Sequence, residues 1–222
     1  TRLRTVTGVQ TCALPICDVF AFKSTNSDFS IRVPWGNATA TARWNHLFSD
    51  KLFMNTSLIY TNYDFQFEGG LEAFRFKLFS GITDYNIKSD FTWLPSPSHT
   101  VRFGGQYIYH VFVPSNASAQ SGDVVFDLGN VIKNYANDVA VYVNDEFDVN
   151  EKWRINGGLR GTVFQQIGPF DRYLHNPLNG EVTDTVHYEK GDNVKTYARV
   201  EPRLSVRYLI NSKSSLKASY TQ

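Results

Sequence analysis

The sequence is poor in cysteine, methionine and long apolar runs. Its 222 residues include two cysteines and one methionine, and no run of about 18 consecutive apolar residues occurs. This lack excludes a membrane-spanning helix. It does not exclude a membrane-spanning sheet, because the alternating residues of barrel strands average out as polar.

Charge of one sign is also lacking, since 22 Lys and Arg stand against 21 Asp and Glu, a net charge of +1. Such a balance gives no electrostatic support for binding nucleic acid. The histidines are scattered, without metal-ligand spacing such as His-Glu-x-x-His, and the glycine pairs lack the strand, loop and helix setting of a phosphate site. We therefore expect no catalytic, cofactor or metal site, and no enzyme. The histidines, which we expect at the surface or in a barrel lumen, are His46, His99, His110, His175 and His187.

Aromatic residues are abundant, at 15% of the chain with 17 Phe and 12 Tyr. Aromatic and β-branched residues favour strands over helices. Only 42% of the residues are hydrophobic, so a large buried core is not assured. The composition predicts an all-β protein.

The first sixteen residues, Thr1 to Ile16, are interpreted separately from the rest of the chain. Val6 to Ile16 back-translates with ordinary codons to a sequence resembling a common sequencing-adapter oligonucleotide read in frame. We expect residues 1–16 to be an adapter-derived artefact that packs poorly, and residues 17–222 to be the natural segment. A signal peptide is the alternative, although Gln10 and Pro15 interrupt its apolar region. With Cys12 set aside, Cys17 alone cannot form a disulfide or a zinc cluster.

From Asn37 onward the hydrophobic pattern has a period of two, which is typical of strands with two unlike faces. In residues 153–163, one face carries Trp153, Ile155 and Leu159, and the other carries Arg154 and Arg160. The same alternation recurs along the chain. It predicts nine strands at about 19–26, 37–47, 51–66, 72–94, 99–113, 134–149, 152–165, 196–209 and 214–222.

The predicted strands are longer than the five or six residues usual in globular proteins, and a membrane barrel needs about nine to eleven. Their connections also alternate between tight and wide. Because transmembrane barrels have short periplasmic turns and long outer loops, this alternation predicts which side each connection faces. The tight links are 49–50, 95–98, 150–151 and 211–213, and the wide links are 67–71, 114–133 and 166–195.

Several aromatic residues lie near the tight links, where rings commonly sit at a membrane interface. They predict a periplasmic girdle, although a soluble β-sandwich would also bury aromatics between two sheets. The charged residues of the opposite face could form a catalytic or ion-binding cluster, but on a barrel wall they more simply line water or dock a plug. The girdle candidates are Trp44, Trp93, Phe147, Trp153 and Tyr208, and the charged candidates are Asp84, Lys88, Asp90, Arg102, Arg154 and Arg160.

A turn-rich segment, comprising 171–173 and 176–181, falls in the widest predicted loop. It lacks the oxygen-ligand spacing of a calcium loop. We interpret it as an outer loop that could contact ligand but whose sequence explains only its turns. The sequence therefore assigns no ligand-binding residue.

Several phrases of this sequence resemble TonB-dependent receptors of the Bacteroidota type. They are strand-and-turn phrases, so they specify a family better than a substrate. The likeness covers essentially everything after residue 16. The phrases are Trp35 to Phe48, Lys51 to Asn55, Tyr60 to Phe65, Tyr142 to Phe147, Gly157 to Arg160, Glu201 to Ser205 and Ser215 to Gln222.

The resemblance implies an antiparallel meander that forms part of a large barrel, of about 22 strands in that family, enclosing an N-terminal plug. No plug-like stretch or TonB box is visible, and nine strands cannot close such a barrel, so we expect a fragment without the plug domain. The implied function is uptake of a scarce nutrient (siderophore, cobalamin, peptide or oligosaccharide) across a Gram-negative outer membrane. Its implied partners are lipid, the nutrient and the TonB complex, and it leaves room for a surface lipoprotein. A passive porin-like barrel, a soluble β-sandwich binding module and an outer-membrane hydrolase are the alternatives.

Overall fold

The computed structural model describes residues 8–23, 29–71, 74–121, 124–127 and 133–222. All of its regular elements there are strands, and none of the described residues forms a helix long and apolar enough to span a membrane. The strands are β1 (Gly8–Lys23), β2 (Ser30–Ser49), β3 (Leu52–Leu71), β4 (Phe74–Ser96), β5 (His99–Ser121), β6 (Val124–Asp127), β7 (Asn134–Asp148), β8 (Trp153–Ile167), β9 (Phe170–His175), β10 (Val182–Tyr188), β11 (Asn193–Asn211) and β12 (Ser214–Thr221).

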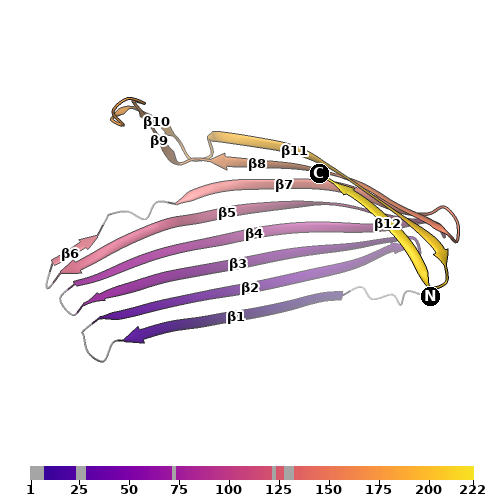
Figure 1. The fold of residues 1–222 in the computed structure, drawn as a ribbon, viewed down its shortest axis with the longest axis horizontal. Coiled ribbons are helices and arrows are strands. Elements are labelled where there is room, and N and C mark those ends of the chain that lie inside the picture. Colours follow the sequence, from indigo (N-terminus) through magenta and orange to yellow (C-terminus); the bar gives the residue numbers. More distant parts are fainter. Residues whose placement is uncertain (1–7, 24–28, 72–73, 122–123, 128–132) are drawn as a thin grey trace.

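One large sheet contains ten of these strands, in the order β1-β2-β3-β4-β5-β7-β8-β11-β12, with β6 paired beside β5. Every pairing is antiparallel, and β9 and β10 form a separate hairpin. Figure 1 shows the long strands side by side in a single curved layer, with the β9–β10 hairpin at the end opposite the turns that follow β2 and β11. The predicted all-β meander is confirmed. A two-layer sandwich is not formed by the described residues.

The long strands exceed their predicted lengths. The wide link expected at 67–71 is wrong, because β3 stays paired with β4 as far as Leu71↔Phe74. The links expected at 114–133 and 166–195 likewise contain the end of β5, all of β6, the β9–β10 hairpin and the start of β11. Backbone pairing continues in these segments without an alternating side-chain pattern. Because the prediction relied on that pattern, it placed the ends of the strands too early. Residues 24–26 and 72–73 of the predicted strands lie outside the described residues.

The expectation that residues 1–16 make few contacts is wrong for the part that is described. Gly8 to Ile16 pairs residue by residue with β2, from Gly8↔Asn45 to Ile16↔Asn37. Ladder hydrogen bonds use only backbone groups, so an edge strand can be added with little regard to its side chains. Leu14 and Ile16 on this strand remain exposed. The strand therefore does not test the origin of the segment, and residues 1–7 lie outside the described residues.

One face of the large sheet, called the apolar face here, exposes large hydrophobic side chains instead of covering them. At the middle of the sheet one row of paired residues crosses five strands, and each of its side chains is at least 41% exposed. Soluble monomers rarely expose a continuous apolar patch of more than a few hundred Å². Lipid is the solvent that suits this face. The row consists of Leu58, Ile87, Tyr107, Val139 and Val163.

The apolar face forms a band of limited height. On β8 it runs from Trp153 to Val163, about 33 Å along the strand, which a tilt of about 40° reduces to the 25 Å typical of barrels. A row of tyrosines marks its outer limit, with ring centroids 5.5 Å apart for Tyr60 and Tyr85, 6.4 Å for Tyr85 and Tyr109, and 6.1 Å for Tyr109 and Tyr135. Amphipathic rings of this kind gather at membrane interfaces. This outer row was not predicted from the sequence.

Aromatic residues also contact one another near the short turns, where the sequence predicted a girdle. The rings of Trp153 and Tyr208 are 4.5 Å apart, and Phe147 stacks on His99 at 4.2 Å. Trp44 and Trp93 are both exposed.

The tight turn after β7 is stabilised by Asn150, whose Oδ1 accepts hydrogen bonds from the backbone N–H groups of Lys152 and Trp153 at 2.9 and 3.0 Å.

Candidate functional site

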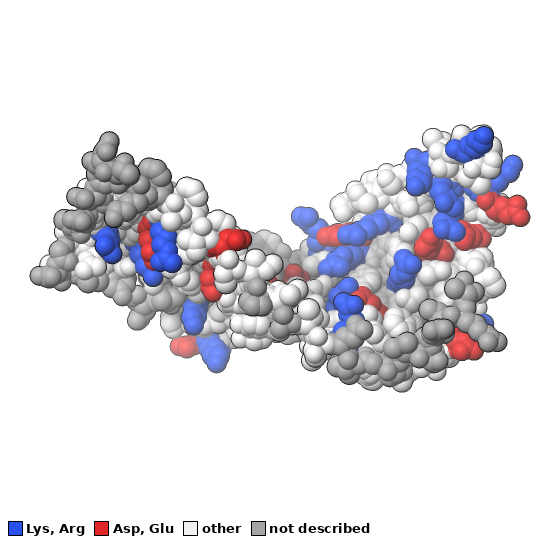
Figure 2. Space-filling view, turned by 90° about the horizontal axis from the view of Figure 1, so that it is seen from below, with Lys and Arg blue, Asp and Glu red and all other residues white. Residues whose placement is uncertain are grey.

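The second face of the sheet, called the polar face here, carries the charged side chains. Because pairing is antiparallel and side chains alternate, residues offset by one from the apolar rows share this face. Figure 2 shows Lys and Arg gathered over the end of the molecule that contains the short turns. On β4, β5, β7, β8, β11 and β12 the cations of this region outnumber the acids two to one, although the whole chain is nearly neutral. The cations are Lys88, Arg102, Arg154, Arg160, Arg199, Arg203, Arg207 and Lys217, and the acids are Asp90, Glu146, Asp148 and Glu201.

A hollow of about 390 Å³ lies within this cationic region and is called the cationic hollow. Four of its lining residues are cations and none is acidic. The hollow lies level with the half of the apolar band that is nearer the short turns. On β4, Lys88 follows Ile87 toward the short turn, and on the paired strand β5, Arg102 is next to Val101. Its lining is Lys88, Arg102, Gln106, Tyr142, Val143, Asn144, Gly158, Leu159, Arg160 and Arg203.

Two glycines leave room for neutral side chains at the cationic hollow, and one of them, Gly158, lines it. A Cβ on Gly104 would lie 2.3 Å from the backbone oxygen of Ser89 and 2.7 Å from the hydroxyl of Tyr142, so no larger residue fits there. A Cβ on Gly158 would lie 2.7 Å from Oδ1 of Asn144. The hydroxyl end of Tyr142 therefore packs against the backbone at Gly104.

Tyr142 also stands between two cations. Lys88 Nζ and the guanidinium carbon of Arg160 each lie 6.0 Å from the centroid of its ring, at the outer limit of cation–π contact. Lys88 pairs with Asp90 at 2.9 Å. Arg160, in contrast, has no carboxylate within ion-pair distance among the residues whose side chains the structure describes. The residue directly opposite Arg160 on β11 is Glu201, whose carboxylate pairs with Arg203 at 3.3 Å.

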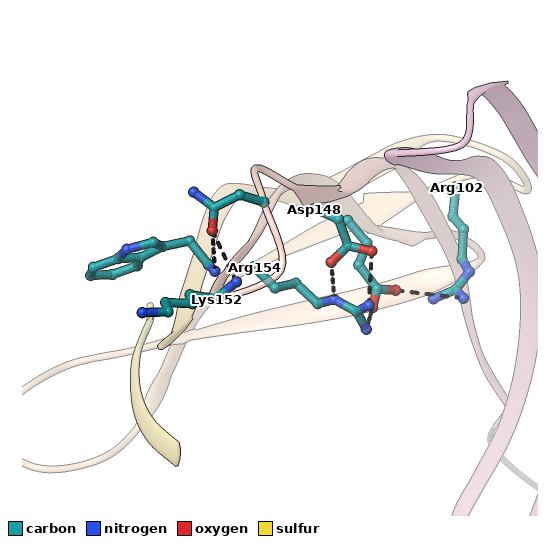
Figure 3. A network of polar contacts seen from close by, with 7 residues as sticks. Arg102, Asp148, Lys152 and Arg154 are labelled. Carbon is teal, nitrogen blue, oxygen red and sulfur yellow. Dashed lines mark hydrogen bonds and ion pairs between the residues drawn. The ribbon is translucent and has the colours of Figure 1, made fainter. Parts of the chain in front are cut away.

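An ion-pair network lies beside the cationic hollow, next to the β7–β8 turn (Figure 3). Arg154 donates from Nη2 to Asp148 Oδ2 at 2.8 Å and from Nη1 to Glu146 Oε1 at 3.0 Å, and its Nε also donates to Asp148. Arg102 approaches Glu146 at 3.9 Å. Two-point contact between guanidinium and carboxylate fixes the relative orientation of the groups. The network therefore ties β5, β7 and β8 together on the polar face.

Two histidines of the large sheet pair with carboxylates. His110 Nδ1 lies 2.7 Å from Asp84 Oδ1, and His99 Nδ1 lies 2.7 Å from Asp145 Oδ2. His46 contacts aromatic rings instead. Throughout the described part of the chain, no group of three His, Cys, Asp or Glu side chains could hold a metal ion. These pairs link β5 to β4 and β5 to β7.

The β9–β10 hairpin is well ordered at its tip. Asn176 Oδ1 accepts from the N–H of Leu178 at 2.9 Å, and Asn179 Oδ1 accepts from the N–H of Glu181 at 3.1 Å. Gly180, at φ +74°, supplies the left-handed conformation that the turn needs. Leu178 is 94% exposed at this tip. The turn predicted at 176–181 is present, whereas 171–173, also predicted as turn-rich, lies in strand β9.

His187 lies at the base of the same hairpin, outside the large sheet. Its Nδ1 bonds to Asp171 and its Nε2 lies 3.4 Å from Glu189 Oε1. The hydrogen bond to Asp171, then the charge of Asp171, raise the pKa of His187 above its ordinary value of 6.5. Both carboxylates favour the protonated ring.

The structure brings together part of the charged set that was singled out in the sequence. Lys88, Arg102 and Arg160 meet in the cationic hollow, whereas Arg154 belongs to the adjacent network. Asp84 lies apart, with His110. Sequence reasoning missed Tyr142, Arg203 and Glu146. Alternation placed each on the polar face, but only the register between strands shows that they are neighbours.

Comparison with known proteins gives the same architecture. A family model described as TonB dependent receptor-like, beta-barrel matches residues 18–222. No curated protein matches the chain.

The solved structures that resemble this chain are larger. The ferric citrate transporter FecA in its unliganded form has a TM-score of 0.60 at 16% identity, over 85% of this chain and 27% of that one. The ferric-catecholate import receptor Fiu of E. coli K12 has TM-scores of 0.58 (closed form) and 0.60 (open form), at 13% and 12% identity. Each Fiu comparison covers 90% of this chain, and 34% and 37% of the Fiu chains. At such identities the likeness concerns the fold, and the chain spans about a third of the length of these structures.

Proposed function

Since this chain belongs to the TonB-dependent receptor-like β-barrel family, we propose that it forms part of the barrel of a Gram-negative outer-membrane receptor. That receptor imports a scarce nutrient, using energy delivered through TonB. Within it the nine long strands serve as wall: the apolar face meets lipid and the polar face lines the interior.

The observation that carries this proposal is the division of the two faces, in a segment matched by the family over residues 18–222. A wall one strand thick needs an outer surface that lipid can solvate and an inner surface that tolerates water and protein. Rows such as Leu58, Ile87 and Tyr107 supply the first. The cationic region supplies the second.

The energising partner acts through parts of the receptor other than this wall. We propose that a plug with a TonB box, carried elsewhere in the full-length receptor, couples the barrel interior to the TonB complex. A surface lipoprotein is a further candidate partner at the outer end, where the exposed β9–β10 hairpin lies. Lipid is the third partner, at the apolar face.

For the ligand, the four classes implied by the family are siderophores, cobalamin, peptides and oligosaccharides. The titles of the similar structures name ferric citrate and ferric catecholates, so ferric chelates are the first ligands to test. The fold alone does not choose among the classes, because a wall of this kind is shared by receptors of different ligands.

The test is uptake by intact cells that express the full-length receptor containing this chain. We expect uptake of one labelled ligand from the four classes to require the receptor and to stop when TonB is deleted or the proton gradient is collapsed. A small sugar that diffuses through general porins serves as the control, since its entry does not use TonB. Receptor-dependent uptake that persists without TonB would show a passive porin-like barrel instead.

A further inference from the structure

We propose that the cationic hollow is a binding site for a carboxylate-rich group inside the barrel. The inference rests on the proposed function only in requiring that the polar face line the barrel interior. It assigns a ligand chemistry to a part of the wall that lies far from the outer loops.

Seven of the ten residues that line the cationic hollow carry side-chain hydrogen-bond donors, and four of those seven are cations. Lys88, Arg102, Arg160 and Arg203 surround a space of about 390 Å³, and the acids nearest in the sheet do not line it. Gln106, Asn144 and the hydroxyl of Tyr142 add neutral donors. An anion with several acceptor oxygens matches this lining, whereas a cation would meet only repulsion.

The partners of these cations show which charge is available. Lys88 and Arg203 each have a carboxylate at 2.9 and 3.3 Å, and Arg102 has a distant one at 3.9 Å. Arg160 has none within ion-pair distance among the described side chains, although Glu201 is its cross-strand neighbour. Its guanidinium carbon lies 6.0 Å from the centroid of the Tyr142 ring. A guanidinium binds a carboxylate through two parallel hydrogen bonds. Arg160 is therefore the principal contact.

The position of the cationic hollow strengthens the electric field of its cations. Behind it lies one layer of sheet and then the apolar face, with Val141 and Leu159 exposed where lipid would be. A cleft lined by charges of one sign and backed by a low-dielectric wall concentrates the electric field within it. Salt screens such a site less than it screens an exposed surface charge.

Two glycines determine how closely the neutral donors Tyr142 and Asn144 approach the sheet. A side chain at Gly104 would strike the Ser89 backbone and the Tyr142 ring, and one at Gly158 would strike Asn144. The absence of a side chain at these positions lets Tyr142 and Asn144 lie close to the sheet, where they line the hollow beside the cations.

Two sources could supply the carboxylates: a soluble polycarboxylate in the course of transport, or an acidic segment of the polypeptide that fills the barrel interior. Both use the same chemistry. The test therefore needs one arm that detects a free anion and another that detects an occupant already in place.

The test uses the full-length receptor in detergent, with propane-1,2,3-tricarboxylate as the probe and its neutral triamide as the control ligand. The variants are Arg160→Gln and the matched Arg199→Gln, which removes the same charge from the polar face outside the cationic hollow. Binding is measured by calorimetry and thermal unfolding by scanning calorimetry, each at two salt concentrations.

If the source is a free anion, the wild type and R199Q bind the tricarboxylate but not the triamide, and R160Q binds it about 10- to 100-fold more weakly. If the source is the interior polypeptide, the wild type does not bind the probe, and R160Q lowers the unfolding temperature while R199Q does not. The proposal is overturned if the probe does not bind and both variants unfold at the same temperature as the wild type. It is also overturned if R160Q and R199Q lose affinity for the probe, or unfolding temperature, to the same extent.

These readouts do not depend on energised transport. Receptor-dependent uptake without TonB would overturn the proposed function while leaving anion binding intact. Conversely, if uptake depends on TonB but R160Q behaves like R199Q, the proposed site is overturned and the proposed function is not.

Discussion

Arg199 and Val200 are neighbours on β11, yet their side chains leave the sheet on opposite sides. Val200 is 60% exposed on the apolar face, in the row that contains Val141. Arg199 shares the polar face with Thr162 and the cations. The apolar face needs only that its residues be apolar, whereas the polar face depends on particular partners at particular distances. The two faces should therefore fail in different ways.

The largest effect is expected when the apolar face receives a charge. Val200→Arg should destabilise the receptor in lipid by about 1–3 kcal/mol, because the guanidinium would lie within the hydrocarbon, one row inside the outer edge of the apolar band. The reciprocal change, Arg199→Leu, should cost less than about 1 kcal/mol, since it removes an exposed charge from a wet surface. Urea unfolding of the full-length receptor in phospholipid vesicles measures both. Equal costs at the two positions would contradict the assignment of the faces.

The next comparison uses two adjacent glycines. Gly104→Ala should cost about 1–3 kcal/mol, because the new Cβ would lie 2.3 Å from a backbone oxygen that cannot move freely. Gly105→Ala, on the apolar face, meets its nearest atom at 3.6 Å and should change stability by less than about 1 kcal/mol. The same unfolding measurement applies. If Gly104→Ala were tolerated as well as Gly105→Ala, the packing of Tyr142 against the backbone at Gly104 would be wrong.

A smaller effect is expected from the ion-pair network. A double-mutant cycle on Arg154→Met and Asp148→Asn should give a coupling of about 0.5–1 kcal/mol, because the two side chains are partly exposed, at 38% and 42%. The coupling should shrink in about 1 M salt. Arg203 and Glu201, 3.3 Å apart on one strand, form the control pair with weaker expected coupling. A coupling free energy that did not change with salt concentration would indicate a contact that is not electrostatic.

The smallest effect concerns His187, which lies outside both faces. Its pKa is raised in the folded hairpin, so its contribution to stability is fully present below the unfolded value of 6.5 and is lost as pH rises through the folded pKa. Amide hydrogen exchange in β9 and β10 should therefore quicken, beyond its intrinsic dependence on pH, as pH rises above 6.5. His187→Gln should remove that excess. His175, whose Nδ1 contacts the Gly180 carbonyl at 3.1 Å, provides the control H175Q, which should retain it.

These comparisons also show how far the sequence could be interpreted. Period-two alternation predicted the positions of the long strands from β2 onward and the two faces of β4, β5, β8 and β12, because lipid and water impose opposite demands on successive side chains. It could not predict how far the strands continue past the membrane. Beyond about residue 113 of β5 no alternating pattern is required, yet the backbone remains paired to Ser121.

The cationic hollow was beyond sequence analysis for a related reason. Lys88, Arg102 and Arg160 lie on β4, β5 and β8, and only the register of three pairings places them together. The tyrosine row across β3, β4, β5 and β7 depends on register in the same way. A one-residue slip would move every such side chain to the other face. Asp171 and His187 were likewise predicted only as loop residues, because strands of six and seven residues carry too little pattern to detect.

The strand order of the large sheet has a consequence for how such a wall can change over evolutionary time. Each long strand is paired with the next long strand along the chain, and successive strands run in opposite directions. Loss or gain of a single strand would reverse every strand after it and move each later loop to the wrong side of the membrane. Loss or gain of a whole hairpin leaves the direction of the rest unchanged. The hairpin is therefore the natural unit of insertion and deletion, and related walls should differ from this one by even numbers of strands.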